Sequence, residues 1–411
     1  MTKRNKLDTL IGIIHHHDPV VSNNYICPPR KTQARSHVKF NVISIEDGSL
    51  YATLIKNSGL RLFVNPMKWT DLHLTLLDME FHKLPPLTQP VPTVDSSKAT
   101  IDLSASAQAL LGALNTLLET KSTECRTRSM LTVISMLYPQ NMSFLGISEL
   151  HQYFGGRAYR IDCPVQAAWE VTPARSSYTT AKGSMSMRAK ESVEGPIMEN
   201  IDGRNVRKQP VLVYVDLKTI AVTRRARYKL PRSNPPVRRL KKLLFRKITP
   251  PNMVEDPFLA AFILALAQQH SYGAVPPSAN KPSMSSPGSS FLEEPRFQDS
   301  TVRILAVDDK EPSAPCFISY EGKVRKELLQ KFHDPTKNYP VKEEETLVGT
   351  LEGSTNMQIE YAEVPIWPIL GLKERVGQAL GKEVAGPFDE NNFETWEQDP
   401  KPKPEAGHQQ S

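Results

Sequence analysis

The sequence predicts an α+β protein with two mixed domains, joined by a basic, proline-containing connector and flanked by disordered termini. Hydrophobic residues make up 39% of the 411 residues, which is enough for packed cores. The 34 prolines gather in particular segments, as in modules separated by stiff linkers. Predicted strands and predicted helices follow one another in blocks, and that order favours an α+β arrangement over a doubly wound one.

Shifts in composition divide the chain into five segments. These are a flexible N-terminal segment over 1–36, a mixed α+β domain over 37–223, the basic connector over 224–250, a small α+β domain over 251–385 with a flexible insert at 271–300, and a disordered acidic tail over 386–411.

The first domain is predicted to run from strands to helices and back to strands. Asp47-Gly48 supplies the turn of a hairpin, and Ser104 caps the first helix. Residues 69–84 fit a strand or a helix equally well. The predicted strands cover 37–46, 49–55, 60–64, 157–163, 165–171 and 211–222, the predicted helices cover 105–120, 127–138 and 144–154, and a long loop covers 176–202.

The second domain opens with a helix that Asp256 caps and that has Pro257 in its first turn. Residues 258–267 are apolar on every side of this helix, which predicts a central, buried position. Strands at 302–307, 316–320 and 357–364 and helices at 323–332 and 370–380 follow.

Four stretches of this domain carry a resemblance. They are DPFLAAFILALAQQ from Asp256, VRILAV from Val302, HDPTK from His333 and IEYAEVPIWP from Ile359. Together they resemble a family of fungal proteins of uncharacterised activity, over about residues 255–380. The resemblance implies a fungal source and a compact α+β module. It implies no activity and no site residue.

The cysteines and the hydropathy pattern indicate where the chain works. The four cysteines lie far apart with no C-x-x-C pair, which favours a reducing compartment. The longest apolar stretch, Phe258 to Ala267, is about half of the roughly 18 residues that a membrane span needs. We therefore expect a soluble, intracellular protein without a membrane span. His15, His16 and His17 are adjacent in a flexible segment and do not make a preorganised metal site.

Positive charge is concentrated in one block. Twelve Lys or Arg and no Asp or Glu lie between Lys218 and Lys247, while the whole chain has a net charge of only +7. Two clusters within this block resemble a two-part nuclear-import signal, which import receptors bind as extended chain. A phosphate-binding surface for nucleic acid, a membrane-surface helix and a plain solvated linker are the alternatives. The candidate contact residues are Arg224, Arg225, Arg227, Arg238, Arg239, Lys241, Lys242, Arg246 and Lys247.

One pair of residues is a candidate for catalytic chemistry. Asp216 and Lys218 follow a hydrophobic strand and match the D/E-x-K element of a nuclease superfamily, in which the carboxylate holds Mg²⁺. A second carboxylate is required, and Asp162 and Glu170 are available. A strand that ends at solvent explains the triplet more simply. No nucleotide-binding or nucleophile-elbow motif is present, so we expect no cofactor.

The acidic tail offers a partner site. Phe388, Phe393 and Trp396 lie among acidic residues, which keep aromatic side chains in water and available to a protein groove. The sequence thus predicts a non-enzymatic nuclear interaction factor linked to transcription or chromatin. A magnesium-dependent nuclease and a cytoplasmic interaction module are the alternatives.

Overall fold

The structure is a computed structural model of the chain. It describes residues 44–88, 104–146, 149–161, 165–171, 210–228, 234–272, 295–309, 311, 313–340 and 355–386. The predicted segment 1–36, the loop 176–202, most of the strand 37–46 and of the insert 271–300, and all but Gly386 of the tail lie outside these residues.

A seven-stranded mixed sheet organises the described residues, in the order β1-β9-β8-β7-β6-β5-β2. The β1–β9 and β6–β7 pairs are parallel, and the other neighbours are antiparallel. A separate hairpin consists of β3 and β4. The strands are β1 Met79–Lys83, β2 Met142–Gly146, β3 His151–Phe154, β4 Arg157–Arg160, β5 Ala167–Val171, β6 Leu212–Val215, β7 Ser300–Asp308, β8 Cys316–Val324 and β9 Met357–Pro365.

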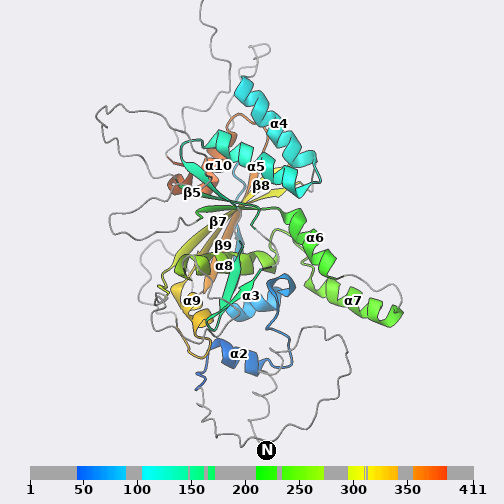
Figure 1. Ribbon diagram of the computed structural model, residues 1–411, viewed down its shortest axis with the longest axis vertical. Coiled ribbons are helices and arrows are strands. Elements are labelled where there is room, and N and C mark those ends of the chain that lie inside the picture. The colour runs from blue at the N-terminus through cyan, green and yellow to red at the C-terminus, as the bar shows by residue number, and fades with distance from the viewer. Residues whose placement is uncertain are drawn as a thin grey trace, which may run out of the picture. The chain divides into compact units, whose positions relative to one another are not determined.

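Helices cover both faces of the sheet (Figure 1). Alternate residues of each strand point to opposite faces, so Val213 joins one core and Tyr214 the other. One face packs against α2 Leu50–Lys56, the short 3₁₀ helix η1 Pro66–Lys68, α3 Asp71–Leu77, α8 Pro257–Tyr272 and α9 Lys326–His333. The opposite face packs against α4 Ala105–Glu119, α5 Thr123–Leu137, α10 Leu372–Leu380 and α11 Lys382–Ala385.

The sheet crosses the predicted domain boundary. Strand β6 comes from the predicted first domain and β7 from the predicted second, yet Leu212 pairs with Arg303 and Val215 with Ala306. The described residues, which begin at Ser44, belong to one compact unit. An α+β fold with a mixed sheet is consistent with the prediction, whereas the two-domain arrangement and the separate connector are not confirmed.

Helix α8 confirms the prediction of a central apolar helix. Every residue from Pro257 to Gln268 is buried, because the helix lies between the sheet and the smaller elements on that face. The Asp256 carboxylate accepts a hydrogen bond from the Phe258 backbone N–H at 2.9 Å, which is the predicted cap. Gln268 holds the β3–β4 hairpin on α8 through both backbone groups of Tyr153.

The predicted N-terminal meander is wrong in the described residues. The Asp47-Gly48 turn is present, with Gly48 at φ 81°, but it leads into helix α2 instead of a return strand. The Ser49 hydroxyl accepts from the Ala52 N–H at 3.2 Å and starts that helix. Residues 60–64 form no strand. Within 69–84 both alternatives occur in succession, as α3 and β1.

The predicted helix over 144–154 is also wrong. This stretch contains parts of β2 and β3, because sheet pairing overrides the helix-like apolar spacing of a short segment. Gly155 and Gly156 form the β3–β4 turn, with φ values of 57° and 72° that suit a tight hairpin.

Predictions for other elements agree with the structure, with shifted ends. Helices α4, α5, α9 and α10 and strands β4, β5, β7, β8 and β9 occupy predicted positions. The predicted strand 211–222 ends at Val215, and helix α6 Leu217–Arg227 follows it. None of the described helices is long and apolar enough to cross a bilayer.

Candidate functional site

The predicted basic segment forms two helices, α6 and α7 Pro235–Ile248. In α6, Leu217 and Ile220 are buried in the core that surrounds α8, so this helix is attached to the body of the protein. In α7, Ile248 is the buried residue, and the Asn234 side chain caps the first turn through the Val237 N–H. Pro235 and Pro236 lie in the first turn of α7, where the missing backbone N–H of proline is tolerated.

Arg224 is a structural residue and is not part of an exposed cationic surface. Its side chain is 2% exposed, and its Nη2 donates to Asp256 Oδ1 at 2.7 Å and to Oδ2 at 2.6 Å. Because Asp256 also caps α8, this pair joins α6 to the central helix. Arg224 was a predicted contact for an import receptor or phosphate, and its burial removes it from any such surface.

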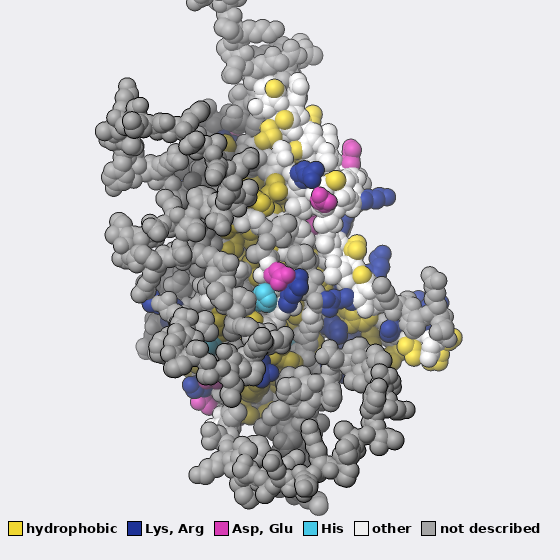
Figure 2. All heavy atoms as spheres, in the orientation of Figure 1, with side chains coloured by type: hydrophobic (Ala, Val, Ile, Leu, Met, Phe, Trp, Pro, Cys, Tyr) yellow, Lys and Arg dark blue, Asp and Glu magenta, His cyan; other side chains and the backbone are white. Residues whose placement is uncertain are grey.

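The other cations of the block lie on the surface. Arg225 and Arg227 are exposed at the end of α6. Helix α7 contains six Lys or Arg and no acidic residue. Figure 2 shows dark-blue and yellow side chains together at the place that α7 occupies in Figure 1. The exposed cations of α7 are Arg238, Arg239, Lys242, Arg246 and Lys247, and Lys241 is half-buried.

Helix α7 also exposes apolar side chains. Leu240 is 57% exposed and Leu243 is 54% exposed. Phe245 is half-buried and lies beside Tyr228, with ring centroids 5.8 Å apart. The helix is therefore held at its C-terminal end, while the rest of it offers cations and leucines to solvent.

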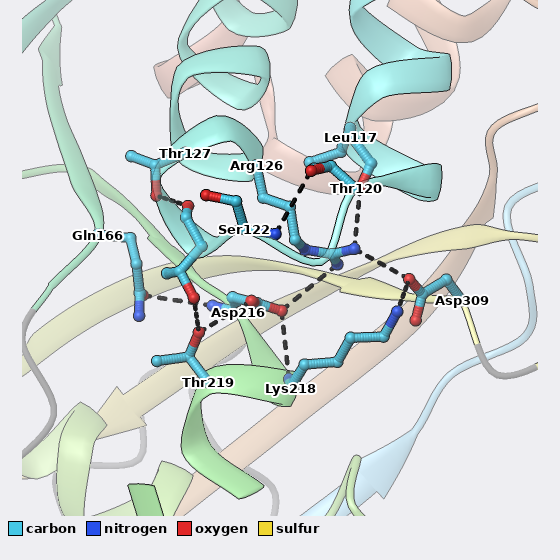
Figure 3. Close-up of polar contacts among 11 residues, drawn as sticks. Leu117, Thr120, Ser122, Arg126, Thr127, Gln166, Asp216, Lys218, Thr219 and Asp309 are labelled. Atoms are coloured by element: carbon cyan, nitrogen blue, oxygen red, sulfur yellow. Dashed lines mark hydrogen bonds and ion pairs between the residues drawn. The ribbon is translucent and has the colours of Figure 1, made fainter. Parts of the chain in front are cut away.

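Asp216 lies in a buried polar cluster at the carboxyl ends of the parallel strands β6 and β7 (Figure 3). Its carboxylate caps α6 by accepting from the Lys218 N–H at 3.2 Å, and it accepts from the Thr219 hydroxyl at 2.9 Å. Arg126 of α5 lies 3.4 Å from the same carboxylate. Asp216 and Arg126 are each 1% exposed.

The second carboxylate of this cluster is Asp309. Arg126 Nη1 donates to Asp309 Oδ2 at 3.0 Å, and the Lys218 ammonium donates to the same oxygen. Burial alone would raise the pKa of Asp309, but the hydrogen bonds from Lys218 and Arg126 outweigh it and hold the pKa below its usual value. In Figure 3 the Arg126 guanidinium reaches between the two carboxylates.

The carboxylates predicted to assist Asp216 do not join it. Glu170 lies beyond the opposite end of β6 from Asp216, about 16 Å along the strand direction at ~3.3 Å per residue. There it accepts a hydrogen bond from the Ser143 hydroxyl at 2.8 Å. Asp162 lies outside the described residues.

This cluster is built to stabilise the fold. One guanidinium and one ammonium balance the two carboxylates, and the oxygens of Asp216 already accept from a helix N–H and a hydroxyl. A Mg²⁺ ion would compete with the Arg126 guanidinium for both carboxylates. Among the residues that the structure describes, no group of three His, Cys, Asp or Glu is placed to hold a metal ion. The geometry therefore does not favour the nuclease alternative.

Asp309 is not among the predicted site residues, because it lies just after the predicted strand 302–307, which was assigned to a different domain from Asp216. The sequence nevertheless carries a signal for it, since Val215-Asp216-Leu217-Lys218 and Val307-Asp308-Asp309-Lys310 both follow apolar strands. Two such strand ends meet when the strands pair in parallel, as β6 and β7 do.

Comparisons with known proteins add no assignment. A scan against models of protein families finds no match to this chain, and a search of curated proteins finds no similar sequence. The predicted partner residues Phe388, Phe393 and Trp396 lie outside the described residues.

Proposed function

We propose that this protein is a non-enzymatic interaction factor of the nucleus, linked to transcription or chromatin, which binds nucleic-acid phosphates through α7. The observation that carries the proposal is a surface helix with six cations and no acid. Lys and Arg side chains that neutralise phosphates release counterions, and this release supplies most of the sequence-independent affinity for nucleic acid.

The structure of the basic segment bears on how it would meet an import receptor. The first cluster retains Arg225 and Arg227, because Arg224 is buried against Asp256. The second cluster is helical, so binding as extended chain requires α7 to unwind. Only Ile248 of α7 is buried, which keeps the cost of unwinding low. Nuclear import through the cations of α7 thus remains part of the proposal.

Two further parts of the proposal rest on sequence. The acidic segment with Phe388, Phe393 and Trp396 would bind another protein. We also propose that residues 255–380 share their fold with the fungal family that they resemble. Three of the resembling stretches form α8, β7 and β9.

A binding measurement with matched variants tests the proposal. Fluorescence anisotropy with a labelled 20-base-pair duplex would compare the wild type with a variant that carries Arg238→Gln, Arg239→Gln and Lys242→Gln. Gln is nearly as good a helix former as Arg and Lys, so α7 should persist. A control variant carries Lys56→Gln, Lys68→Gln and Lys121→Gln, which removes equal charge from exposed positions outside α6 and α7.

We expect the α7 variant to bind DNA at least tenfold more weakly than the control variant at the same salt concentration. Equal weakening in both variants would mean that net charge, and not α7, determines binding. No binding by the wild type would contradict the proposal outright.

A further inference from the structure

A cavity of about 450 Å³ lies on the α8 face of the sheet, well separated in sequence from α7. Its walls come from α2, η1, α3, the β3–β4 hairpin and α9. The volume is in the range of pockets that hold small molecules. The Arg126 cluster lies on a different set of elements and contributes no side chain to the cavity.

Aromatic rings form much of the cavity wall. Phe63 lies 5.1 Å from Phe154 and 5.9 Å from Tyr159 between ring centroids, with the planes tilted by 55° and 82°. Phe154 in turn meets Phe332 edge to face at 5.9 Å. Phe63 is 44% exposed, although it belongs to this cluster. Such a wall favours a flat apolar occupant, which can stack on one ring and meet the edges of others.

Most polar groups of the lining are already satisfied. The Thr53 hydroxyl donates to the Ser49 carbonyl at 3.1 Å. His73 is neutral, because its Nδ1 accepts from the Thr70 N–H at 3.0 Å while its Nε2 lies 3.2 Å from the Leu62 carbonyl. Burial lowers the pKa of His73, which agrees with this state. At the rim, Arg160 pairs with Glu149 at 2.8 Å, so no net charge is offered there.

Gln152 supplies the amide of the lining. The residue as a whole is 8% exposed, but its amide nitrogen and oxygen are not enclosed by protein, and they have no hydrogen-bond partner among the residues that the structure describes. Because water can reach this amide, a ligand group that pairs with it gains the net contribution of one hydrogen bond, about 0.5–1.5 kcal/mol. An amide presents a donor and an acceptor side by side, and another amide matches both.

We propose that this cavity binds a neutral, planar aromatic molecule that carries a carboxamide or lactam edge, with that edge paired to Gln152. Charged ligands are disfavoured, because Arg160, the charged side chain among the described residues of the lining, is already paired with Glu149. A simple aliphatic chain would leave the Gln152 amide unsatisfied. This site is independent of the nucleic-acid proposal.

Two probe molecules test the assignment directly. Naphthalene-1-carboxamide and naphthalene share a flat apolar body and differ in the amide. Equilibrium dialysis of the full chain against each compound gives two dissociation constants. We expect the carboxamide to bind about 2- to 12-fold more tightly, which corresponds to ~0.5–1.5 kcal/mol for one net hydrogen bond.

Three variants complete the test. Gln152→Leu should bind naphthalene as well as the wild type does and lose the preference for the carboxamide. Gln140→Leu, at an exposed position in the turn between α5 and β2, should keep the wild-type preference. Ala158→Phe should fill the cavity and abolish binding of both probes, with circular dichroism to confirm folding.

Absence of saturable binding of either probe to the wild type would overturn the proposal, as would a carboxamide preference that persists in Gln152→Leu. The α7 variant with three glutamines should bind both probes normally. The DNA-binding proposal and the cavity proposal are therefore tested independently, and failure of either one does not contradict the other.

Discussion

The buried ion pair between Arg224 and Asp256 gives the sharpest quantitative prediction. Asp256→Asn keeps a side-chain oxygen that can cap α8, but it leaves the Arg224 guanidinium buried without a counter-charge. The two side chains are 2% and 1% exposed, so water cannot replace the lost partner. Breaking a buried pair in this way costs about 3–5 kcal/mol, which is a large part of the ~5–15 kcal/mol that holds a typical protein folded.

Urea unfolding monitored by circular dichroism measures this loss. Arg224→Met keeps the apolar stem of the side chain and removes its charge, so the double variant carries no uncompensated charge. The double variant combines Asp256→Asn with Arg224→Met. We expect its free energy of unfolding to be at least about 2 kcal/mol higher than the value obtained by adding the losses of the two single variants. Arg225→Met, at the exposed neighbouring position, should change stability by less than about 0.5 kcal/mol. An Asp256→Asn protein within about 0.5 kcal/mol of the wild type would refute the assignment of Arg224 to the core.

Three further predictions concern import, the polar cluster and its pH dependence. A fluorescently tagged protein with Arg238, Arg239, Lys241 and Lys242 changed to Ala should lose nuclear enrichment, and a distribution identical to that of the wild type would defeat the import proposal. Asp216→Ala should lower the free energy of unfolding by at least the ~0.5–2 kcal/mol that a helix cap contributes. The same variant should leave any Mg²⁺-dependent cleavage of plasmid DNA unchanged. Loss of cleavage in this variant alone would restore the nuclease hypothesis. Because the folded-state pKa of Asp309 is depressed, its ionised form stabilises the protein above the unfolded-state pKa of about 3.9, and this contribution is lost as the pH falls through the folded-state value. The stability difference between the wild type and Asp309→Asn should thus be constant from pH 5 to 7 and shrink below about pH 4, and a difference that stays constant down to pH 3 would contradict the role of Asp309.

Local sequence rules predicted the elements whose causes are local. The Ser104 and Asp256 caps, the all-apolar helix α8 and the amphipathic helix α7 were predictable from residue types and spacing. The segment around Ser49 was not, because its β-branched residues suggest a strand while a serine cap and packing on the α8 face produce a helix.

The arrangement of the strands required long-range information. Nothing in residues 211–222 shows that β6 pairs with β7, some 90 residues later, so the sequence does not reveal that strands from both predicted domains join one sheet. For the same reason, the sequence does not show that Asp309 lies in one cluster with Asp216, or that Arg224 pairs with Asp256. A count of charges along the chain treats Arg224 and Arg238 alike, and only tertiary structure separates the buried one from the exposed one.

The exposed leucines of α7 bear on the choice of its partner. Phosphate contacts use the cations and leave Leu240 and Leu243 in water. Against a membrane surface, the same leucines would be buried in the headgroup region. Changing Leu240 and Leu243 to Gln should therefore leave DNA binding within about twofold of the wild type, and a larger loss would mean that apolar contacts dominate.

The salt dependence of DNA binding tests the role of α7 most directly. Each phosphate neutralised on duplex DNA contributes about 0.9 to the slope of log K against log salt concentration. If Arg238, Arg239 and Lys242 each contact a phosphate, their change to Gln should make the slope shallower by about 2.7, while the variant with Lys56, Lys68 and Lys121 changed should keep the wild-type slope. Identical slopes for the wild type and the α7 variant would show that this helix does not meet the phosphates.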